Sequence, residues 1–347
     1  MSRAGRRGRR RAALALAAVL ALPESSCATG YVARSAYEEA RLLWRRQPIE
    51  RVLAGDVDAE TRAKLELALA VRRFAADDLG LSVGGSFASL ATVDAGQVVH
   101  VVSAAPRDRL TPYTWWFPIV GRVPYRAYFD RADADALARD LEREGYDTYV
   151  RPAVAFSTLG WFDDPLLSSL LRYDDERLAE TIIHELLHST IYLPGHAAFN
   201  ESFATFVGQR GAERFFRLRG DAARADRTAA RWADALTFSA FLGRLIDALQ
   251  TAYAAGVRGA GRDALFDAAR AEFAALQWQT GEYADFTQAP LNNAIILHDQ
   301  LYADRLQRFA DAYAHNRGDL RQAITWIREH VRDQSDPFAA LESALGG

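Results

Sequence analysis

The stretch that decides the fold reads Thr181-Ile-Ile-His184-Glu185-Leu-Leu-His188-Ser-Thr190. It contains no helix-breaking residue, and its apolar residues recur at helical spacing, so we expect a largely buried helix. On such a helix His184 and His188 lie one turn apart on one face, where both imidazoles reach the same point. This spacing is typical of a zinc site in which Glu185 takes a proton from water. The alternative is a buried helix that carries two histidines for packing.

Zinc in a hydrolytic site has three protein ligands, so a third ligand is required near the two histidines. Two candidates follow the motif, His196 and Glu201. The residues Leu193-Pro194-Gly195 predict the end of the first helix, and Asn200 is our candidate N-cap of a second one. Two helices joined by a short turn lie antiparallel, so a carboxylate on the second can face the histidines on the first. We therefore predict that Glu201, rather than His196, completes a site for one zinc ion, and that small Ala204 lets the helices approach.

The five residues 200–204 read Asn-Glu-Ser-Phe-Ala and have the form Asn-Glu-x-x-Ala. Together with the histidine motif they resemble the glutamate-ligand zinc peptidases, and more narrowly a family of bacterial lipoproteins described as zinc aminopeptidases. Residues 46–53, 116–130, 156–166 and 291–294 carry the same resemblance, which extends from about residue 30 to about residue 320. It implies a zincin-like fold, a peptide or protein substrate, and hydrolysis of peptide bonds, with an aminopeptidase as the expected activity.

The chemistry that this resemblance implies is the activation of water by zinc, with Glu185 as the general base. The residues by themselves would serve an endopeptidase or another amide hydrolase equally well. Two further classes stay open. One is a lipid-anchored binding or scaffold protein with a structural or degenerate zinc site, which a fourth protein ligand would favour. The other is an envelope protease that acts on one protein, which an unblocked cleft would favour.

Several residues outside the metal motif are candidates for contact with the substrate. A predicted edge strand that could pair with an extended peptide contains Ser157, Thr158, Leu159 and Gly160, although a plain loop is the alternative. Asp163 could receive a substrate amine or cap a helix. His298 and Tyr302 lie one turn apart on a predicted helix, and either could stabilise negative charge on a carbonyl oxygen. Asn293 is a further candidate, and a structural role is the alternative for each of these residues.

The first 26 residues predict a lipoprotein-type signal peptide. Six arginines precede an apolar run over residues 12–22, which is too short to span a bilayer as a stable anchor. Cys27, the only cysteine of the chain, follows and is the expected lipid acceptor, as the resemblance also implies. We therefore expect a lipid-anchored protein of the bacterial cell envelope that faces the periplasm. The outer membrane is preferred, because Ala28 gives no retention signal of the aspartate kind; a simple signal peptide cut near Ala28 is the alternative.

The composition is that of an ordinary globular protein, with 50% hydrophobic and 25% charged residues. Residues 1–26 contain six of the 42 basic residues and one of the 45 acidic ones, so the remainder of the chain is the more acidic part. This charge argues against nucleic acid as a partner and against a polybasic membrane patch. A single cysteine also excludes disulfides within the chain.

The predicted fold is α+β and mostly helical, with a small mixed sheet before the histidine helix and a helical bundle at the C-terminus. Predicted strands cover residues 97–104, 114–120 and 146–151. Predicted helices outside the site cover residues 36–54 (interrupted at Pro48), 57–79, 130–143, 222–255, 263–276, 291–316, 319–332 and 337–345. We expect four regions: the signal at 1–26, a helical segment at 27–80, a catalytic core at 81–221, and a helical region at 222–347 that closes the cleft.

Overall fold

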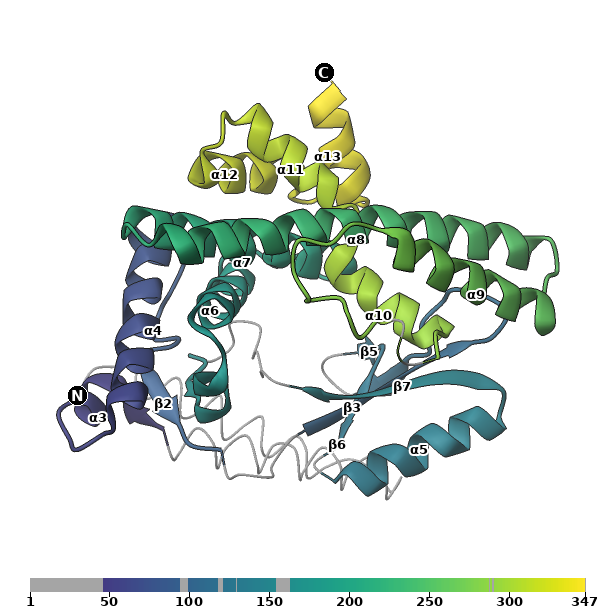
Figure 1. Ribbon diagram of the computed structural model, residues 1–347, viewed down its shortest axis with the longest axis horizontal. Helices are drawn as coiled ribbons and strands as arrows, with labels where there is room; N and C mark the ends of the chain where they lie inside the picture. The colour runs from purple at the N-terminus through teal and green to yellow at the C-terminus, as the bar shows by residue number, and fades with distance from the viewer. Residues whose placement is uncertain are drawn as a thin grey trace.

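The computed structural model describes residues 46–93, 99–117, 121–128, 130–153, 163–286, 288 and 290–346 (Figure 1). Its helices are α3 (Ile49–Leu53), α4 (Ala59–Asp77), α5 (Arg131–Arg143), the 3₁₀ helix η1 (Ser168–Arg172), α6 (Asp175–Thr190), α7 (Ala197–Leu218), α8 (Ala222–Ala254), α9 (Ala260–Ala275), α10 (Asn293–Ala303), α11 (Leu306–His315), α12 (Leu320–Val331) and α13 (Pro337–Gly346). Its strands are β1 (Gln47–Pro48), β2 (Ser89–Ala91), β3 (Val99–Pro106), β4 (Trp115–Phe117), β5 (Gly121–Val123), β6 (Arg126–Tyr128), β7 (Tyr146–Ala153) and β8 (Leu166–Leu167). The predicted α+β class, with helix predominant, is confirmed.

The described strands form three small sheets, where we had predicted one mixed sheet. Their orders are β1-β2-β8, β6-β3-β7 and β4-β5. Only the first sheet is mixed, because β2 pairs antiparallel with β1 and parallel with β8. The longest ladder is antiparallel and joins β3 to β7, with Val99 opposite Ala153 and Pro106 opposite Tyr146. Helix α5 packs against this β3–β7 ladder (Figure 1).

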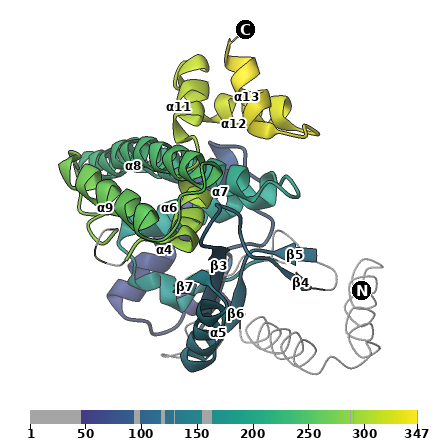
Figure 2. The ribbon, with the colours of Figure 1, turned by 90° about the vertical axis from the view of Figure 1, so that its right-hand side faces the viewer.

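The centre of the helical part is the pair α6 and α7, with α4 packed against α6 and the long helix α8 packed against α7 (Figure 1). Helix α6 is buried along two neighbouring lines of side chains, since Leu178, Ile182 and Leu186 on one line and Ile183 and Leu187 on the other are at most 1% exposed. This explains the apolar residues on more than one face of its sequence. Helices α11, α12 and α13 lie on the side of α8 away from the sheets (Figure 2). The histidine helix is therefore packed into the main hydrophobic core.

The region 291–316 forms two helices, where the sequence predicted one. Helix α10 ends at Ala303, and Arg305 adopts a left-handed backbone conformation with φ of 48° before α11 begins. The hydroxyl of Ser202 accepts a hydrogen bond from the Asp304 amide at 3.0 Å, and the hydroxyl of Ser239 accepts one from the Leu306 amide at 3.1 Å. These contacts from α7 and α8 stabilise the break, and they turn α10 across α7 toward β3 and β7 (Figure 1).

The other predicted helices match those of the structure to within a few residues. The helix expected over 36–54 is described only from Ile49 onward, directly after Pro48. The signal peptide, Cys27 and the candidate edge strand from Ser157 to Gly160 lie outside the described residues. The main hydrophobic cluster runs from Ile49 to Leu341 and so crosses the expected boundary at residue 221. Within the described part of the chain, no helix is long and apolar enough to cross a membrane.

Candidate metal centre

The turn between α6 and α7 is fixed by Asn200, which is 5% exposed. Its side-chain oxygen accepts a hydrogen bond from the Leu193 amide at 3.0 Å, and its side-chain nitrogen donates to the Leu193 carbonyl at 2.8 Å. Helix α7 begins at Ala197, one turn earlier than we expected, so Asn200 lies inside the helix and is not its N-cap. A buried amide that satisfies both backbone groups of one turn residue sets the angle between the two helices.

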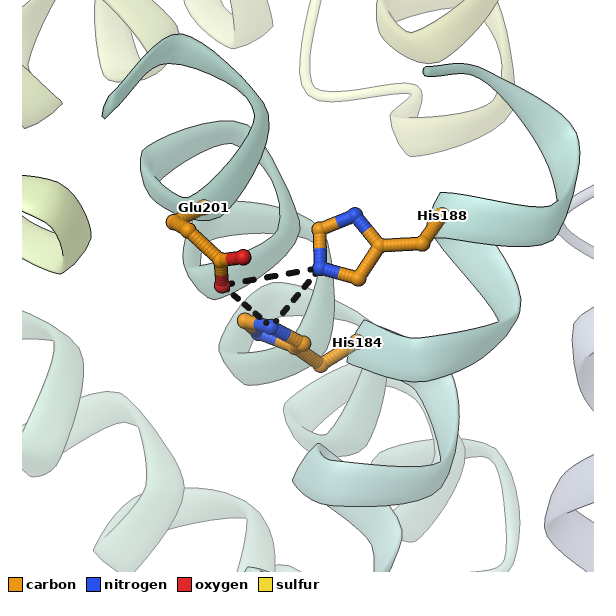
Figure 3. A group of neighbouring side chains, drawn as sticks. All are labelled: His184, His188 and Glu201. Atoms are coloured by element: carbon orange, nitrogen blue, oxygen red, sulfur yellow. Dashed lines mark hydrogen bonds and ion pairs between the residues drawn. The ribbon is translucent and has the colours of Figure 1, made fainter. Parts of the chain in front are cut away.

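Three side chains converge across the α6–α7 interface: His184 and His188 from α6 and Glu201 from α7 (Figure 3). The Glu201 Oε2 atom lies 3.2 Å from His184 Nε2 and 3.5 Å from His188 Nε2. The two Nε2 atoms are 3.2 Å apart. These three residues could hold a metal ion. Within the described residues, they form the one group of three or more histidine, cysteine or acidic side chains that is close enough to do so. The structure therefore brings Glu201 to the two histidines.

The charges of this group are strongly coupled. Burial alone would raise the pKa of Glu201, but hydrogen bonds and charge from His184 and His188 outweigh it and hold that pKa well below its usual range. Burial likewise opposes the charged form of His184, yet Glu201 and Glu185 raise its pKa. The Glu185 Oε2 and His188 Nδ1 atoms are buried without a hydrogen-bond partner. Glu185 therefore adds a second carboxylate whose charge acts on His184.

The candidate Tyr302 lies next to His184, one of the three converging side chains. Its ring centroid is 6.3 Å from that of His184, and the two rings are stacked at 29°. His298 lies one turn earlier on α10, where its ring contacts those of Tyr302 and Tyr149 at 5.3 Å each. Burial lowers the pKa of His298 to about 3, so this imidazole is neutral. Burial and the charge of Glu201 raise the pKa of Tyr302 above its usual value, so its hydroxyl keeps its proton.

Other candidates lie in structural positions. His196 precedes α7 and lines a separate cavity of about 490 Å³ beside Arg328 and Arg332. The Asp163 carboxylate accepts a hydrogen bond from the Gly85 amide at 2.7 Å. Neither residue belongs to the group that could hold a metal.

Asn293 is fully buried at the start of α10. It accepts a hydrogen bond from the Tyr253 hydroxyl at 2.7 Å and donates to the Pro106 carbonyl at 2.8 Å, so it ties α10 to α8 and β3. Within the described residues, none of the hydrogen bonds of Asn293 goes to His184, His188 or Glu201. Its proposed contact with substrate therefore stays a prediction from the sequence.

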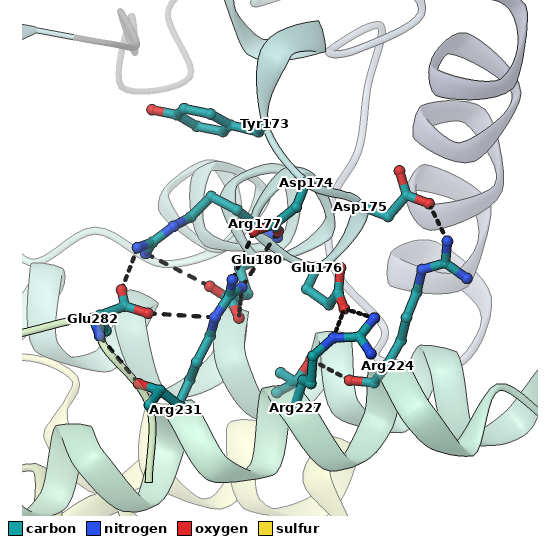
Figure 4. Close-up of polar contacts among 12 residues, drawn as sticks. Tyr173, Asp174, Asp175, Glu176, Arg177, Glu180, Arg224, Arg227, Arg231 and Glu282 are labelled. Carbon is teal, nitrogen blue, oxygen red and sulfur yellow. Dashed lines mark hydrogen bonds and ion pairs between the residues drawn. The ribbon is translucent and has the colours of Figure 1, made fainter. Parts of the chain in front are cut away.

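A cavity of about 330 Å³ opens beside His184 and Glu185. It is lined by residues of α6, α7, α8, α10, the loop that precedes α10 and the first residue of α11. Its far end is an ion-pair network in which Arg177 and Arg231 both contact Glu180 and Glu282 (Figure 4). No sequence pattern predicts this cavity, because its lining residues extend from Arg177 to Leu306 and come from segments far apart in the chain.

Gly208 is the residue of this site that sequence reasoning missed. It lies two turns beyond Glu201 on α7, where a Cβ atom would lie 2.8 Å from the Glu180 carbonyl oxygen of α6. A glycine in the interior of an otherwise strong helix was the available signal, because such a residue costs helix stability unless packing requires it.

A helix pair that presents His-Glu-x-x-His from one helix and a carboxylate from the next is typical of metal-dependent hydrolases. The comparison with protein families agrees with this class. The chain matches the Aminopep family, described as "Putative aminopeptidase", over residues 30–336, and it belongs to that family. The description implies a peptidase, a hydrolase whose substrates are peptides. Neither the comparison with curated proteins nor that with solved structures found a match.

Proposed function

We propose that this protein is a zinc-dependent aminopeptidase that uses Glu185 as its general base. The observation that carries the proposal is the spacing of the three converging donor atoms. Zinc binds histidine nitrogen and carboxylate oxygen at about 2.0–2.1 Å in a tetrahedron, so its ligand atoms lie about 3.3 Å from one another. The corresponding distances among His184, His188 and Glu201 are 3.2, 3.2 and 3.5 Å. The donor set and its spacing both fit zinc.

Zinc held in this way supplies Lewis-acid polarisation of a carbonyl group and lowers the pKa of a water molecule. Glu185 precedes the proposed ligand His188 by three residues, and its Oε2 atom is buried without a hydrogen-bond partner. Both observations support Glu185 as the proton acceptor. In the proposed reaction Glu185 takes a proton from the attacking water and passes it to the leaving amine. Tyr302 keeps its hydroxyl proton and can donate a hydrogen bond to the negative charge that develops on the carbonyl oxygen.

A purely structural zinc site would need a fourth protein ligand. Among the described residues, the group comprises three ligand residues, His184, His188 and Glu201. This supports a site with one open position for water and substrate, and so favours an enzyme over a scaffold. The description of the family favours an aminopeptidase over an endopeptidase.

The test measures zinc content and peptidase activity on the same preparation of the mature chain. Glu185→Gln is expected to keep one zinc per chain and to lose activity by about 10²–10⁴-fold, because it removes the proton acceptor and leaves the ligands in place. Glu201→Ala is expected to lose both zinc and activity. Glu329→Gln, on the exposed side of α12, serves as the matched control and should retain both. Normal turnover by Glu185→Gln would refute the mechanism, and zinc without turnover on any peptide would favour a binding protein.

We also propose that the enzyme is attached to the cell envelope by lipid on Cys27, facing the periplasm. The support is the arginine-rich and apolar leader that ends at the only cysteine of the chain. Cys27→Ser is expected to move the protein from the membrane fraction to the soluble fraction while its specific activity is unchanged. Membrane association that survives this substitution would contradict lipid attachment at Cys27.

A further inference from the structure

The cavity beside His184 has walls suited to a side chain. Phe238 of α8 and Tyr283 of the loop before α10 stack at 4.4 Å and form one wall, and Tyr302 forms part of another. Gly208 adds no side chain to the floor. Aromatic walls with a few polar groups are typical of small-molecule and side-chain pockets. A volume of about 330 Å³ is ample for one amino-acid side chain.

The charged residues at the far end of the cavity already form ion pairs with one another. Arg177 pairs with Glu282 and lies 3.7 Å from Glu180. Arg231 lies 3.4 Å from Glu180 and 3.3 Å from Glu282 (Figure 4). The Thr181 hydroxyl donates to the Arg177 carbonyl at 2.8 Å. These groups form a fixed polar end wall and leave little hydrogen-bonding capacity for a ligand.

Two acceptors in the same cavity have no partner. Asp299 of α10 forms no hydrogen bond or ion pair among the described residues, and the charge of Arg151 is the one cation that acts on it electrostatically. Gln209 of α7 is 8% exposed, and its Oε1 atom is buried without a hydrogen-bond partner. Leaving a buried amide oxygen unpaired is costly, and the carboxyl group of half-buried Asp299 lines the cavity without a hydrogen-bond partner. A ligand that brings hydrogen-bond donors would satisfy both.

The charge of the side chains that line the cavity favours a positively charged ligand. Of the four carboxyl groups that line the cavity, those of Glu180 and Glu282 are paired with Arg177 and Arg231. The carboxyl groups of Glu185 and Asp299 have no such partner among the described residues and give the cavity its negative character. A negative, partly enclosed cavity attracts a positive group and repels an anion. An ammonium or guanidinium group also carries several N–H donors, which matches two vacant acceptors.

We propose that this cavity is a specificity pocket for a positively charged group of the substrate next to the scissile bond, with Asp299 as its counter-ion and Gln209 Oε1 as a second acceptor. The inference rests on the proposed peptidase function, because it places the pocket beside the reacting groups His184 and Glu185. The charged group is an amine that comes either from the free N-terminus of the peptide or from a basic side chain. In both cases Asp299 pairs with the positive charge and Gln209 Oε1 accepts a hydrogen bond from it.

The experiment measures equilibrium binding of three product-like amides to the zinc-loaded chain by calorimetry. Norleucine amide carries only the α-ammonium, Nα-acetyl-lysine amide carries only the side-chain ammonium, and Nα-acetyl-norleucine amide carries neither. We expect one of the two cationic amides to bind at least 10-fold more tightly than the neutral one, and the identity of that amide names the source of the charge. Equal binding of all three would overturn the proposal.

The matched variants are Asp299→Asn and Asp304→Asn, two acids on or at the end of α10. Asp304 is 18% exposed and does not line the cavity. Asp299→Asn is expected to remove the 10-fold preference, and Asp304→Asn is expected to keep it. Gln209→Met, which replaces the amide by a side chain of similar length, should weaken binding of the preferred cation about 3–10-fold. A preference that survives Asp299→Asn in a folded protein would overturn the role of Asp299.

Binding is independent of turnover, so the pocket and the proposed function can fail separately. If the native chain cleaves peptides and Glu185→Gln does not, but all three amides bind equally, the enzyme stands and the pocket is wrong. If the cationic preference depends on Asp299 but no peptide is cleaved, the pocket stands and the peptidase proposal is wrong.

Discussion

Gly208 of α7 lies directly against His184 of α6. A Cβ atom added to Gly208 would come within 3.3 Å of the His184 Cβ atom and within 2.8 Å of the Glu180 carbonyl oxygen. The second contact is with the backbone, so a flexible side chain cannot relieve it. Gly208 therefore allows α6 and α7 to approach closely enough for Glu201, two turns earlier, to reach the two histidines.

Gly208→Ala is expected to weaken zinc binding at least 10-fold. A helical Gly→Ala change by itself would add up to about 1 kcal/mol of stability, but overpacking costs about 1–3 kcal/mol and is relieved by moving the helices apart. Competition with a coloured chelator measures the zinc affinity, and thermal unfolding measures the stability. Gly243→Ala in α8 is the control, because a Cβ atom there meets no atom within 4 Å. It should raise stability slightly and leave zinc binding unchanged.

Asn200→Ala tests the second device that positions Glu201. The substitution removes two partly buried hydrogen bonds to Leu193 and leaves the Leu193 amide unpaired, whereas the Leu193 carbonyl still accepts a hydrogen bond from the His196 amide. We therefore expect a loss of about 1–3 kcal/mol in the free energy of unfolding. Zinc affinity should fall as well, because the turn between the helices loosens. Urea unfolding with and without zinc measures both effects. Asn316→Ala removes one hydrogen bond, to the Ala312 carbonyl at the end of α11, and should leave zinc affinity unchanged.

The site residues that could be predicted from the sequence are those that lie close together along the chain. His184 and His188 are joined by one helical turn, and Glu201 is joined to them by a short connection, so spacing alone brings them together. The long helices were predictable for the same reason, since their apolar periodicity and their caps, such as Asp174 on α6, are local signals.

What the sequence could not reveal depends on contacts between distant segments. The break between α10 and α11 is stabilised by Ser202 and Ser239 and not by a helix-breaking residue. Tyr302 lies on α10 just before this break, so residue spacing alone could name it as a candidate but could not place its ring beside His184. The role of Asn200 was misread because Asn before a helical pattern suggests an N-cap, whereas here its amide bonds the preceding turn.

Tyr302→Phe is expected to lower kcat about 10–10³-fold while zinc content and KM change little. The hydroxyl would be lost as a donor to the developing negative charge, and such donors act mainly in the transition state. Since the pKa of Tyr302 is raised above its usual value, the loss should be the same from pH 6 to pH 9. Tyr313→Phe is the control, because Tyr313 lies against Arg210 away from the site. Unchanged kcat in Tyr302→Phe would assign the tyrosine to packing against His184.

The stability of the protein should depend on pH through Asp299. Burial raises the pKa of Asp299 to about 7 from its ordinary value of 3.8, and Arg151 of β7 lowers it only in part. Tyr149 of β7 and Tyr283 also face this carboxyl group, as does the Arg177–Glu282 pair at the end of the cavity. The folded state thus holds the proton more tightly than the unfolded state does. The contribution of Asp299 is fully present below pH 3.8 and is lost as the pH rises to about 7.

Asp299→Asn cannot ionise, so the variant and the native chain should have similar free energies of unfolding near pH 4. The variant should become the more stable by a few kcal/mol at pH 8, because only the native chain then contains a partly buried carboxylate. Urea unfolding of both proteins at intervals between pH 4 and pH 8 measures the difference. Asp311→Asn, at an exposed ion pair with Arg308, should change stability by about 0.5 kcal/mol or less at every pH. A native chain as stable as Asp299→Asn at pH 8 would mean that Asp299 is already paired, and its availability to a substrate cation would then be refuted.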